Sequence, residues 1–343
     1  MKIGLTFDDV CLAPVYNNVE SRVDPVTATR LSTGVSLGIP IVASNMDTVI
    51  SSALAEVLVK AGSIPIFHRF TNYEQKVAWI KDFPTSFMSC GIRTGDVVEL
   101  EKLLEETDLA GVCFDIAHGH DSRLLTIIYN LKHKYPELEI IAGNVCSPDG
   151  YRDLVSAGAT AVKIGIGPGA ACSTRKVTGF GIPQFTAIQD IAAVKKKLLV
   201  PIIADGGIRG SADVVKALAA GADSVMLGKL FALTNESAAT KRYDANGFTC
   251  KNRGRLMAKY RGQASADFQE EYFGLTKDGT VPEGEAFWAP VSGPAIELIQ
   301  RLMAGLRSGM TYGGSKTIEE LQRKAEFIRV TGNYESESGT RSG

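Results

Sequence analysis

The feature that most constrains the fold is a strand-helix unit that recurs eight times along the chain. Each unit opens with a short apolar run, and amphipathic stretches with apolar residues three and four apart lie between the runs. The runs are residues 39–44, 63–68, 86–92, 110–116, 139–145, 161–167, 200–207 and 223–228. They are continuous rather than alternating, which indicates strands buried on both faces, as a parallel sheet requires.

We therefore predict an α/β fold, a (β/α)8 TIM barrel. A chain of 343 residues suits one barrel of roughly 250 residues with additions. A doubly wound open sheet is the competing fold, but it rarely contains eight such units without a break. We expect one catalytic domain over 1–343, with an irregular N-terminal segment at 1–38, a long insertion after strand eight at 229–293, and a disordered polar tail at 333–343.

Composition narrows the class of partner. A net charge of −1 does not indicate binding to nucleic acid or to an anionic membrane. The first residues lack a basic region followed by an apolar stretch, and no apolar run reaches about 18 residues. We expect a cytoplasmic protein with no nucleic-acid or membrane partner. Its six cysteines include no CxxC pair, which argues against a disulfide framework and a zinc site, so most should be buried.

The segment after strand six is the best candidate for chemistry, because barrel active sites lie at the carboxyl ends of the strands. This cysteine loop, residues 165–184, reads GIGPGAACSTRKVTGFGIPQ and holds one thiol, Cys172. A glycine-rich loop is a poor place to bury a thiol. The neighbours Ser173, Thr174 and Arg175 supply hydroxyls and positive charge that favour a thiolate. The loop predicts a nucleophilic cysteine, although a buried structural cysteine is the alternative.

The next two strand ends indicate a phosphorylated ligand. DGGIRG (205–210) follows strand seven and LGKL (227–230) follows strand eight, where barrels bind phosphate on glycine amides. Asp205 suits ribose hydroxyls. The alternative is that Gly206 and Gly207 serve only a tight turn.

Three further strand ends carry polar residues that suit a hydrogen-bonding lining for cofactor or substrate. They are Asp115 with His118 and His120, Asn144, and His68 with Arg69. No carboxylate or cysteine lies at a metal-ligand spacing from the histidines. No GxGxxG follows a strand and opens a helix, so a dinucleotide would bind across the barrel mouth.

Several motifs together resemble the inosine monophosphate dehydrogenase and guanosine monophosphate reductase family over nearly the whole chain. They are LTFDDVCLAPVY, SNMDTV, the cysteine loop, IIADGGIR and KYRGQAS, in the order of the family. The resemblance implies that Cys172 forms a covalent adduct at purine C2, with hydride transfer between C2 and a nicotinamide. The dehydrogenase branch hydrolyses the adduct to xanthosine monophosphate. The reductase branch releases ammonia from GMP and reduces the adduct to IMP with NADPH.

Three features bear on the choice between the branches, and the third is compatible with both. Regulatory CBS modules, usual in the dehydrogenase, are absent between strands two and three. The dehydrogenase has an Arg-Tyr pair in its flap, here residues 269–284, whereas this chain has Glu271 before Tyr272. A carboxylate cannot replace the arginine that helps to activate water. Thr174 and Glu283 match the reductase residues that handle the ammonia proton, although both also occur in dehydrogenases.

We therefore favour an NADPH-dependent GMP reductase over an IMP dehydrogenase that uses NAD. Two features resemble the reductase branch, namely SGMTYGGSK and Lys176. Three segments are more similar to bacterial dehydrogenases, namely VPEG, YRGQAS and KAEFIRVTG. A purine-nucleotide-binding regulator that has lost turnover is the alternative of another class. Ala170 and Lys229, which replace family residues of the phosphate region, motivate it together with Glu271.

The resemblance assigns the remaining roles by position. Cys172, Thr174, Glu283 and Tyr272 would be catalytic. The GMP or IMP site would comprise Ser44, Met46, Asp205, Gly206, Gly207, Gly228, Lys229, Tyr260, Gly262 and Gln263. The cofactor would contact Asp115, Asn144, Arg69 and Gly165. Some members bind potassium through loop carbonyls, here of Gly167, Gly169 and Cys172, and members are typically homotetramers.

Overall fold

The computed structural model describes residues 1–244, 248–249, 252–274 and 281–338. Eight parallel strands form one sheet in the order β4-β11-β10-β9-β8-β7-β6-β5. Their bounds are β4 Ile41–Ala43, β5 Ile66–Phe67, β6 Phe87–Cys90, β7 Gly111–Asp115, β8 Glu139–Val145, β9 Ala161–Ile164, β10 Ile202–Asp205 and β11 Ser224–Leu227. Within the described residues only β4 and β5 lack a shared ladder, so the ring is nearly closed. The predicted TIM barrel is confirmed, and each strand falls inside a predicted run.

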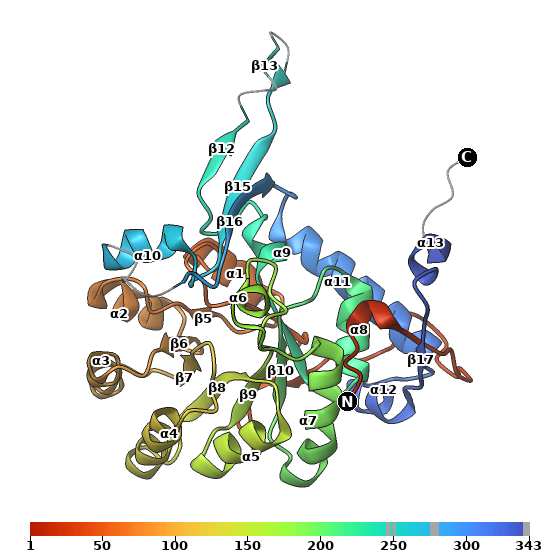
Figure 1. Ribbon diagram of the computed structural model, residues 1–343, viewed down its shortest axis with the longest axis horizontal. Coiled ribbons are helices and arrows are strands. Elements are labelled where there is room, and N and C mark those ends of the chain that lie inside the picture. The colour runs from red at the N-terminus through yellow and green to blue at the C-terminus, as the bar shows by residue number, and fades with distance from the viewer. Residues whose placement is uncertain (245–247, 250–251, 275–280, 339–343) are drawn as a thin grey trace.

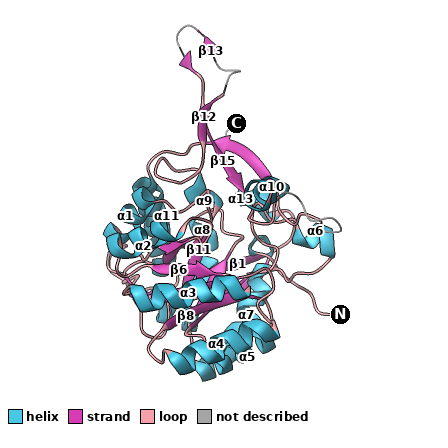
Figure 2. Cartoon of the chain, turned by 90° about the vertical axis from the view of Figure 1, so that its left-hand side faces the viewer, coloured by secondary structure: helices cyan, strands magenta, loops and turns pink. Residues whose placement is uncertain are grey.

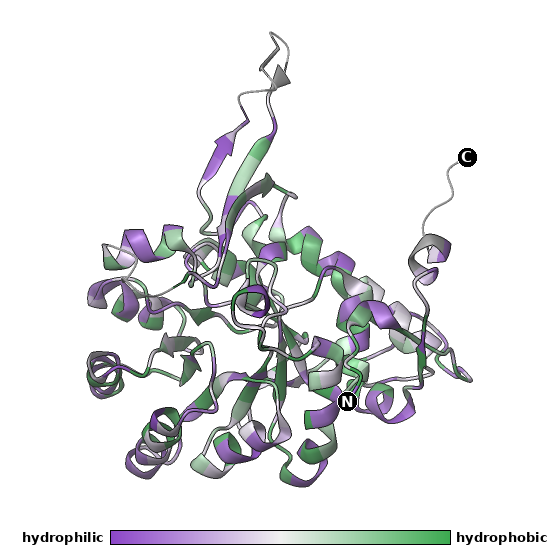
Figure 3. Cartoon of the chain, in the orientation of Figure 1, coloured by the Kyte–Doolittle hydropathy of each residue, from purple (hydrophilic) through white to green (hydrophobic). Residues whose placement is uncertain are grey.

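Helices between the strands cover the outside of the ring (Figure 1). They are α1 Ser52–Lys60, α2 Tyr73–Asp82, α3 Thr94–Glu106, α4 Ser122–Lys134, α5 Pro148–Ala157, α7 Gln184–Leu198, α8 Ser211–Ala219 and, after an insertion, α11 Ala295–Tyr312. Each turns an apolar stripe inward, as α4 does with Leu124, Ile128 and Leu131. Figure 3 shows the same pattern, with hydrophobic residues concentrated on the strands and hydrophilic residues on the outer helix faces.

The barrel interior is a packed core rather than a channel. Every strand contributes one buried residue to a single cluster, which comprises Val42, Ile66, Phe87, Cys113, Ile141, Ala161, Ile203 and Met226. Leu31 and Leu37 of the N-terminal segment complete it. This segment therefore closes the amino-terminal end of the barrel and leaves the carboxyl ends of the strands open for a site.

The N-terminal segment is more ordered than the sequence predicts. It contains the 3-10 helix η1 (Phe7–Asp9), strand β1 (Val10–Leu12) and the hairpin of β2 (Thr29–Arg30) and β3 (Ser36–Leu37). β1 pairs antiparallel with β17 (Phe327–Arg329), near the other end of the chain. The prediction of an irregular segment missed β1 because a pairing partner so distant in sequence leaves no local pattern. It also missed η1 and the β2–β3 hairpin, although both are local.

The insertion after β11 builds a small antiparallel sheet that projects from the barrel mouth (Figure 2). Its strands are β12 (Lys241–Tyr243), β15 (Leu256–Arg261) and β16 (Ala286–Pro290), in the order β12-β15-β16. The short pair β13 (Phe248–Thr249) and β14 (Asn252–Arg253) extends it. In sequence, helix α9 (Lys229–Ala232) precedes the sheet, and helix α10 (Ala266–Phe273) lies between β15 and β16. Part of the predicted flap, residues 275–280, lies outside the described residues.

The last segment departs from prediction in part. Helix α12 (Ile318–Lys324) precedes β17, and a short helix, α13 (Tyr334–Ser338), follows it. The hydroxyl of Tyr334 donates to the Cys11 Sγ at 3.3 Å, which ties α13 to β1. The sequence predicts disorder over 333–343, whereas Tyr334–Ser338 form a short helix, and residues 339–343 lie outside the described residues.

Candidate active site

A pocket of about 690 Å³ opens at the carboxyl ends of the barrel strands. Its walls come from loops after six of the eight strands and from the insertion. Of the residues that the family resemblance assigns to the site, all except Tyr272 line it, namely Ser44, Met46, Arg69, Asp115, Asn144, Gly165, Gly167, Gly169, Cys172, Thr174, Asp205, Gly206, Gly207, Gly228, Lys229, Tyr260, Gly262, Gln263 and Glu283. One concave surface of this size can hold a nucleotide and part of a second ligand.

Cys172 stands exposed on this pocket, unlike the other described cysteines. Cys90 and Cys113 are buried, Cys11 and Cys146 are half-buried, and Cys250 lies outside the described residues. Burial raises the pKa of both the Cys90 and the Cys113 thiol to about 12, so neither supplies a thiolate at neutral pH. The Sγ of Cys172 lies 3.2 Å from the Oγ1 of Thr174, the first residue of helix α6 (Thr174–Thr178).

Backbone hydrogen bonds bring Glu283 beside the cysteine. The Ser173 N–H donates to the Glu283 carbonyl at 2.9 Å, and the Glu285 N–H donates to the Ala171 carbonyl at 2.9 Å. On its other side the same segment donates the Glu283 N–H to the Ala264 carbonyl at 3.1 Å. The cysteine loop, Glu283–Glu285 and the turn after β15 are therefore held as one unit.

The glycines after β10 and β11 leave room for a ligand. Gly206 has a φ of 92°, and a Cβ there would lie 3.0 Å from the Gly169 nitrogen. A Cβ on Gly228 would lie 2.6 Å from the Tyr260 hydroxyl and 3.4 Å from the Ser44 Oγ. Main-chain amides can thus approach an anion closely at both turns. Burial raises the pKa of Tyr260, so its phenol stays protonated as a hydrogen-bond donor.

Ala170 and Lys229, the two residues of this region that replace family residues, differ in their surroundings. Ala170 is exposed at the pocket and offers no hydroxyl. Lys229 is exposed too, and its ammonium lies 5.4 Å from the centre of the Phe287 ring. The position of Lys229 on the pocket wall allows its ammonium to meet an anion.

The predicted cofactor residues form one hydrogen-bonded group with a residue that the sequence reasoning missed. Asn144 donates to the Asp205 Oδ2 at 2.9 Å, and Arg69 donates to the Asp115 carbonyl at 3.0 Å. The missed residue is Lys163 in β9, whose ammonium pairs with both carboxylates. A lysine in the middle of the apolar run AVKIGIG was a signal, since a strand buried on both faces tolerates a charge only when it is paired.

Burial and the neighbouring charges shift the pKa values of Asp115 and Lys163 in opposite directions. Burial by itself would raise the pKa of Asp115, but Lys163, with help from Arg69 and Asn45, outweighs it, and the pKa lies below its ordinary value. The two carboxylates likewise hold the pKa of Lys163 above its ordinary value, against the effect of burial. Lys163 and Asp115 therefore both stay charged at neutral pH.

Tyr272 is the one predicted catalytic residue that does not line the pocket. It lies on α10, where its ring packs 4.5 Å from that of Phe268 and 5.5 Å from that of Phe70. Its neighbour Glu271 accepts a hydrogen bond from Arg261 at 2.5 Å, and Arg261 also binds Asp47. This ion-pair cluster joins α10 to the loop after β4, a tertiary contact that the sequence reasoning did not anticipate.

The predicted histidines also lie off the pocket. His68 is buried against Trp79, with ring centres 5.2 Å apart, and burial lowers its pKa to about 4. His120 bonds the Asp153 carboxylate at 2.7 Å. Across the described chain no three histidine, cysteine or acidic side chains are grouped so as to hold a metal ion.

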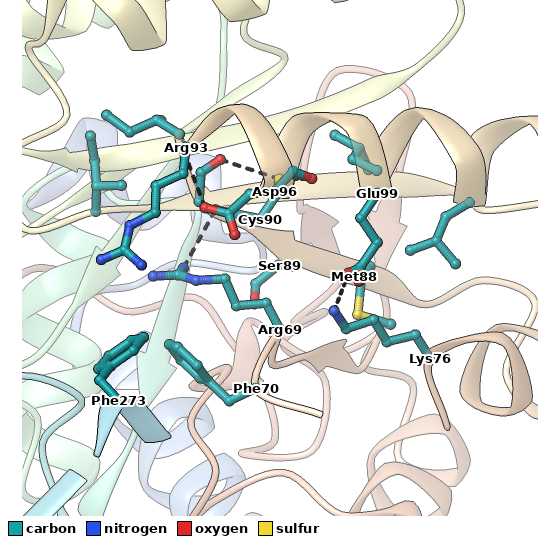
Figure 4. Close-up of a pocket in the computed structure, with 15 residues that line it drawn as sticks. Arg69, Phe70, Lys76, Met88, Ser89, Cys90, Arg93, Asp96, Glu99 and Phe273 are labelled. Atoms are coloured by element: carbon teal, nitrogen blue, oxygen red, sulfur yellow. Dashed lines mark hydrogen bonds and ion pairs between the residues drawn. The ribbon is translucent and has the colours of Figure 1, made fainter. Parts of the chain in front are cut away.

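A second pocket, of about 230 Å³, adjoins the first, and Arg69 and Ile116 line both. Figure 4 shows Arg69 and Arg93 facing the rings of Phe70 and Phe273 across it. The Arg93 guanidinium lies 5.3 Å from the centre of the Phe273 ring and has no carboxylate partner among the described residues. The pocket thus offers aromatic faces together with positive charge.

Comparisons with known proteins agree with this arrangement. The family model of the IMP dehydrogenase / GMP reductase domain matches residues 4–341. The inosine-5′-monophosphate dehydrogenase of Borreliella burgdorferi is 36% identical over 98% of this chain and 96% of its own length. That of Chlorobaculum parvum is 45% identical over 70% of this chain, but the match spans only 49% of the relative.

A solved structure extends the likeness to three dimensions. It is a crystal structure of a GMP reductase variant from Trypanosoma brucei in complex with guanosine 5′-monophosphate. The TM-score is 0.91 at 27% identity, and the match covers 100% of this chain and 98% of that one. Among the described residues, no helix combines the length and apolarity needed to cross a bilayer.

Proposed function

The chain belongs to the IMP dehydrogenase / GMP reductase family, and from this premise we propose that it is an NADPH-dependent GMP reductase. GMP would be held by its phosphate at the turns after β10 and β11, and by its ribose at Asp205. Cys172 would reach C2 of the base. The observation that carries the proposal is the exposed Cys172 thiol beside the Thr174 hydroxyl and Glu283, on the one large pocket that these turns share.

The residues present account for each proton and bond. The Cys172 thiolate attacks C2 of GMP, and the exocyclic amine, protonated through Thr174 and Glu283, leaves as ammonia. The Cys172 sulfur would stay bound to C2. A reduced dinucleotide would supply the hydride to C2, after which the carbon–sulfur bond would break and IMP would leave with the Cys172 thiolate restored.

Asp115, Asn144 and Arg69 would orient the dinucleotide. The pocket that adjoins at Arg69 offers room for its second half, with Phe70 and Phe273 available to contact a base and Arg93 available for a phosphate. An unpaired guanidinium there favours NADPH over NADH, since only NADPH carries the additional phosphate. The Gly169 carbonyl is one of the proposed potassium contacts, and it already accepts a hydrogen bond from the Cys172 N–H at 3.0 Å. A potassium ion would therefore share this oxygen with the Cys172 N–H.

The second candidate, IMP dehydrogenase, is favoured by the curated relatives. Their identities of 36% and 45% exceed the 27% identity to the reductase structure. Against it stands Glu271, which occupies the position of the water-activating arginine and is itself bonded to Arg261. Arg261 has three carboxylate partners, which limits its freedom to replace that arginine.

One assay separates the candidates. The purified protein is incubated with GMP and NADPH, and in parallel with IMP and NAD, while ammonia and NADPH or NADH are followed. Ammonia release with NADPH oxidation supports the reductase, whereas NADH formation from IMP overturns it in favour of the dehydrogenase. Nucleotide binding with no turnover in either mixture, and no adduct on Cys172 by mass spectrometry, would favour a regulator. A Cys172→Ala variant is the control for both reactions.

A further inference from the structure

The side chain of Lys163 is the most deeply buried charge at the barrel mouth. It is 1% exposed, while those of Asp115 and Asp205 are 18% and 20% exposed. Its Nζ pairs with the Asp115 Oδ1 and lies 3.2 Å from the Asp205 Oδ2. One cation thus bridges a carboxylate on β7 and a carboxylate on β10.

Hydrogen bonds extend this bridge across the pocket in both directions. On one side Asn45 donates to the Asp115 Oδ2 at 3.1 Å, and Gln263 donates to the Asn45 carbonyl at 2.9 Å. On the other side Asn144 donates to the Asp205 Oδ2 at 2.9 Å and to the Gly165 carbonyl at 2.8 Å. The chain of contacts runs from the insertion to the start of the cysteine loop, with Lys163 in the middle.

The charges around Lys163 are balanced. Facing it are the two carboxylates and the buried Cys113 thiol, and Arg69 adds a second positive charge through the Asp115 carbonyl. Without the ammonium, two carboxylates would share a partly buried site, and one of them would take up a proton. In the native arrangement the Asp205 Oδ1 has no protein partner in the described chain, so it is free to accept a ligand hydroxyl.

We propose that Lys163 is a positioning residue that sets both substrate-binding carboxylates at once and couples occupancy of the nucleotide half to that of the dinucleotide half. The inference rests on the proposed function, because that function assigns Asp205 to the nucleotide and Asp115 to the dinucleotide. A contiguous network alone does not demonstrate coupling, so binding of the two ligands must be measured separately and together.

The test compares Lys163→Met with Lys163→Arg. A matched control is Lys195→Met, because Lys195 pairs with Asp223 at 2.6 Å below β11, at the opposite end of the barrel. We expect Lys163→Met to raise the KM for both substrates more than about 30-fold. Lys163→Arg should recover part of this loss. Lys195→Met should change thermal stability while both KM values stay unchanged.

The dependence of KM on pH distinguishes a positioning role of Lys163 from a purely structural one, which would not change it. In Lys163→Met we expect KM to fall as pH rises from about 6 to 9, because the shared proton leaves and both carboxylates accept hydrogen bonds again. The native enzyme should show no such slope from these groups. Unchanged KM values and an unchanged profile in a folded Lys163→Met variant would overturn the proposal.

Calorimetric titration keeps this test independent of the reaction catalysed. GMP or IMP is titrated with and without NADP⁺, and the ratio of the two dissociation constants measures the coupling. A ratio that departs from one in the native protein and returns to one in Lys163→Met supports the proposal, and equal ratios in both proteins contradict it. Failure of the proposed function would appear instead as absent turnover in the native protein.

Discussion

The Sγ of Cys172 and the Oγ1 of Thr174 lie 3.2 Å apart, within hydrogen-bond reach of each other. The pair stands at the mouth of the barrel, where the Ser173 N–H is fixed to the Glu283 carbonyl. A hydroxyl in this place can contact the Cys172 sulfur. It can also contact a leaving group on the carbon atom that the sulfur attacks. The geometry therefore suits the proposed roles of Cys172 as nucleophile and Thr174 in proton transfer.

Replacement of Thr174 by valine removes the hydroxyl and keeps the shape of the side chain. We expect kcat for ammonia release to fall about 100-fold, the lower range for loss of general acid catalysis. The KM for GMP should change little, because the contacts proposed for its phosphate and ribose do not involve Thr174. Thr178→Val is the control, since the Thr178 hydroxyl bonds the Thr174 carbonyl at 2.8 Å within α6. Equal rates for Thr174→Val and the native enzyme would contradict the role of Thr174.

Glu283 and Glu285 provide a matched pair on one segment. Glu283 lines the pocket, whereas Glu285 pairs loosely with Lys176 at 3.9 Å. We expect Glu283→Gln to lower kcat at least about 100-fold while Glu285→Gln stays near the native rate. Steady-state rates of NADPH oxidation measure both. A larger loss in Glu285→Gln than in Glu283→Gln would contradict the role proposed for the Glu283 carboxylate.

The sequence predicts the barrel well because its strands are local. A run such as EIIAGNV, buried on both faces, is recognisable without knowledge of its neighbours. The site follows from the same logic, since residues after strands meet at one edge. What escaped prediction depends on contacts between distant segments: the β1–β17 pair, the position of Tyr272 off the pocket, and the two carboxylates that gather on Lys163.

His68 makes the stability of the fold sensitive to acid. Its pKa is lowered to about 4 by burial, whereas the unfolded chain has an ordinary value near 6.5. Between these values the unfolded state binds more protons, so the free energy of unfolding falls as pH drops from about 6.5 towards 4. The full loss is on the order of 3 kcal/mol for this group. Below pH 4 the loss from His68 is complete.

Urea unfolding at pH 7.5 and pH 5 measures this effect. In His68→Gln we expect the loss between the two pH values to be smaller than in the native protein by about 1–2 kcal/mol. His133→Gln, at an exposed histidine on α4, should retain the native pH dependence. The same loss in His68→Gln as in the native protein would mean that other groups cause the acid sensitivity.

Arg93 offers a test of which dinucleotide the protein uses. Its guanidinium lies over the Phe273 ring at the rim of the second pocket and has no carboxylate partner among the described residues. If it meets the additional phosphate of NADPH, Arg93→Glu replaces an attraction by a repulsion, which is worth about 2–3 kcal/mol for a charge-assisted contact. We then expect kcat/KM with NADPH to fall about 30- to 100-fold, and that with NADH to fall much less. Arg152→Glu, on the exposed face of α5 beside Asp149, is the control because it removes the same charge far from both pockets. An equal loss with the two dinucleotides would place the phosphate elsewhere, since only a contact with that group distinguishes them.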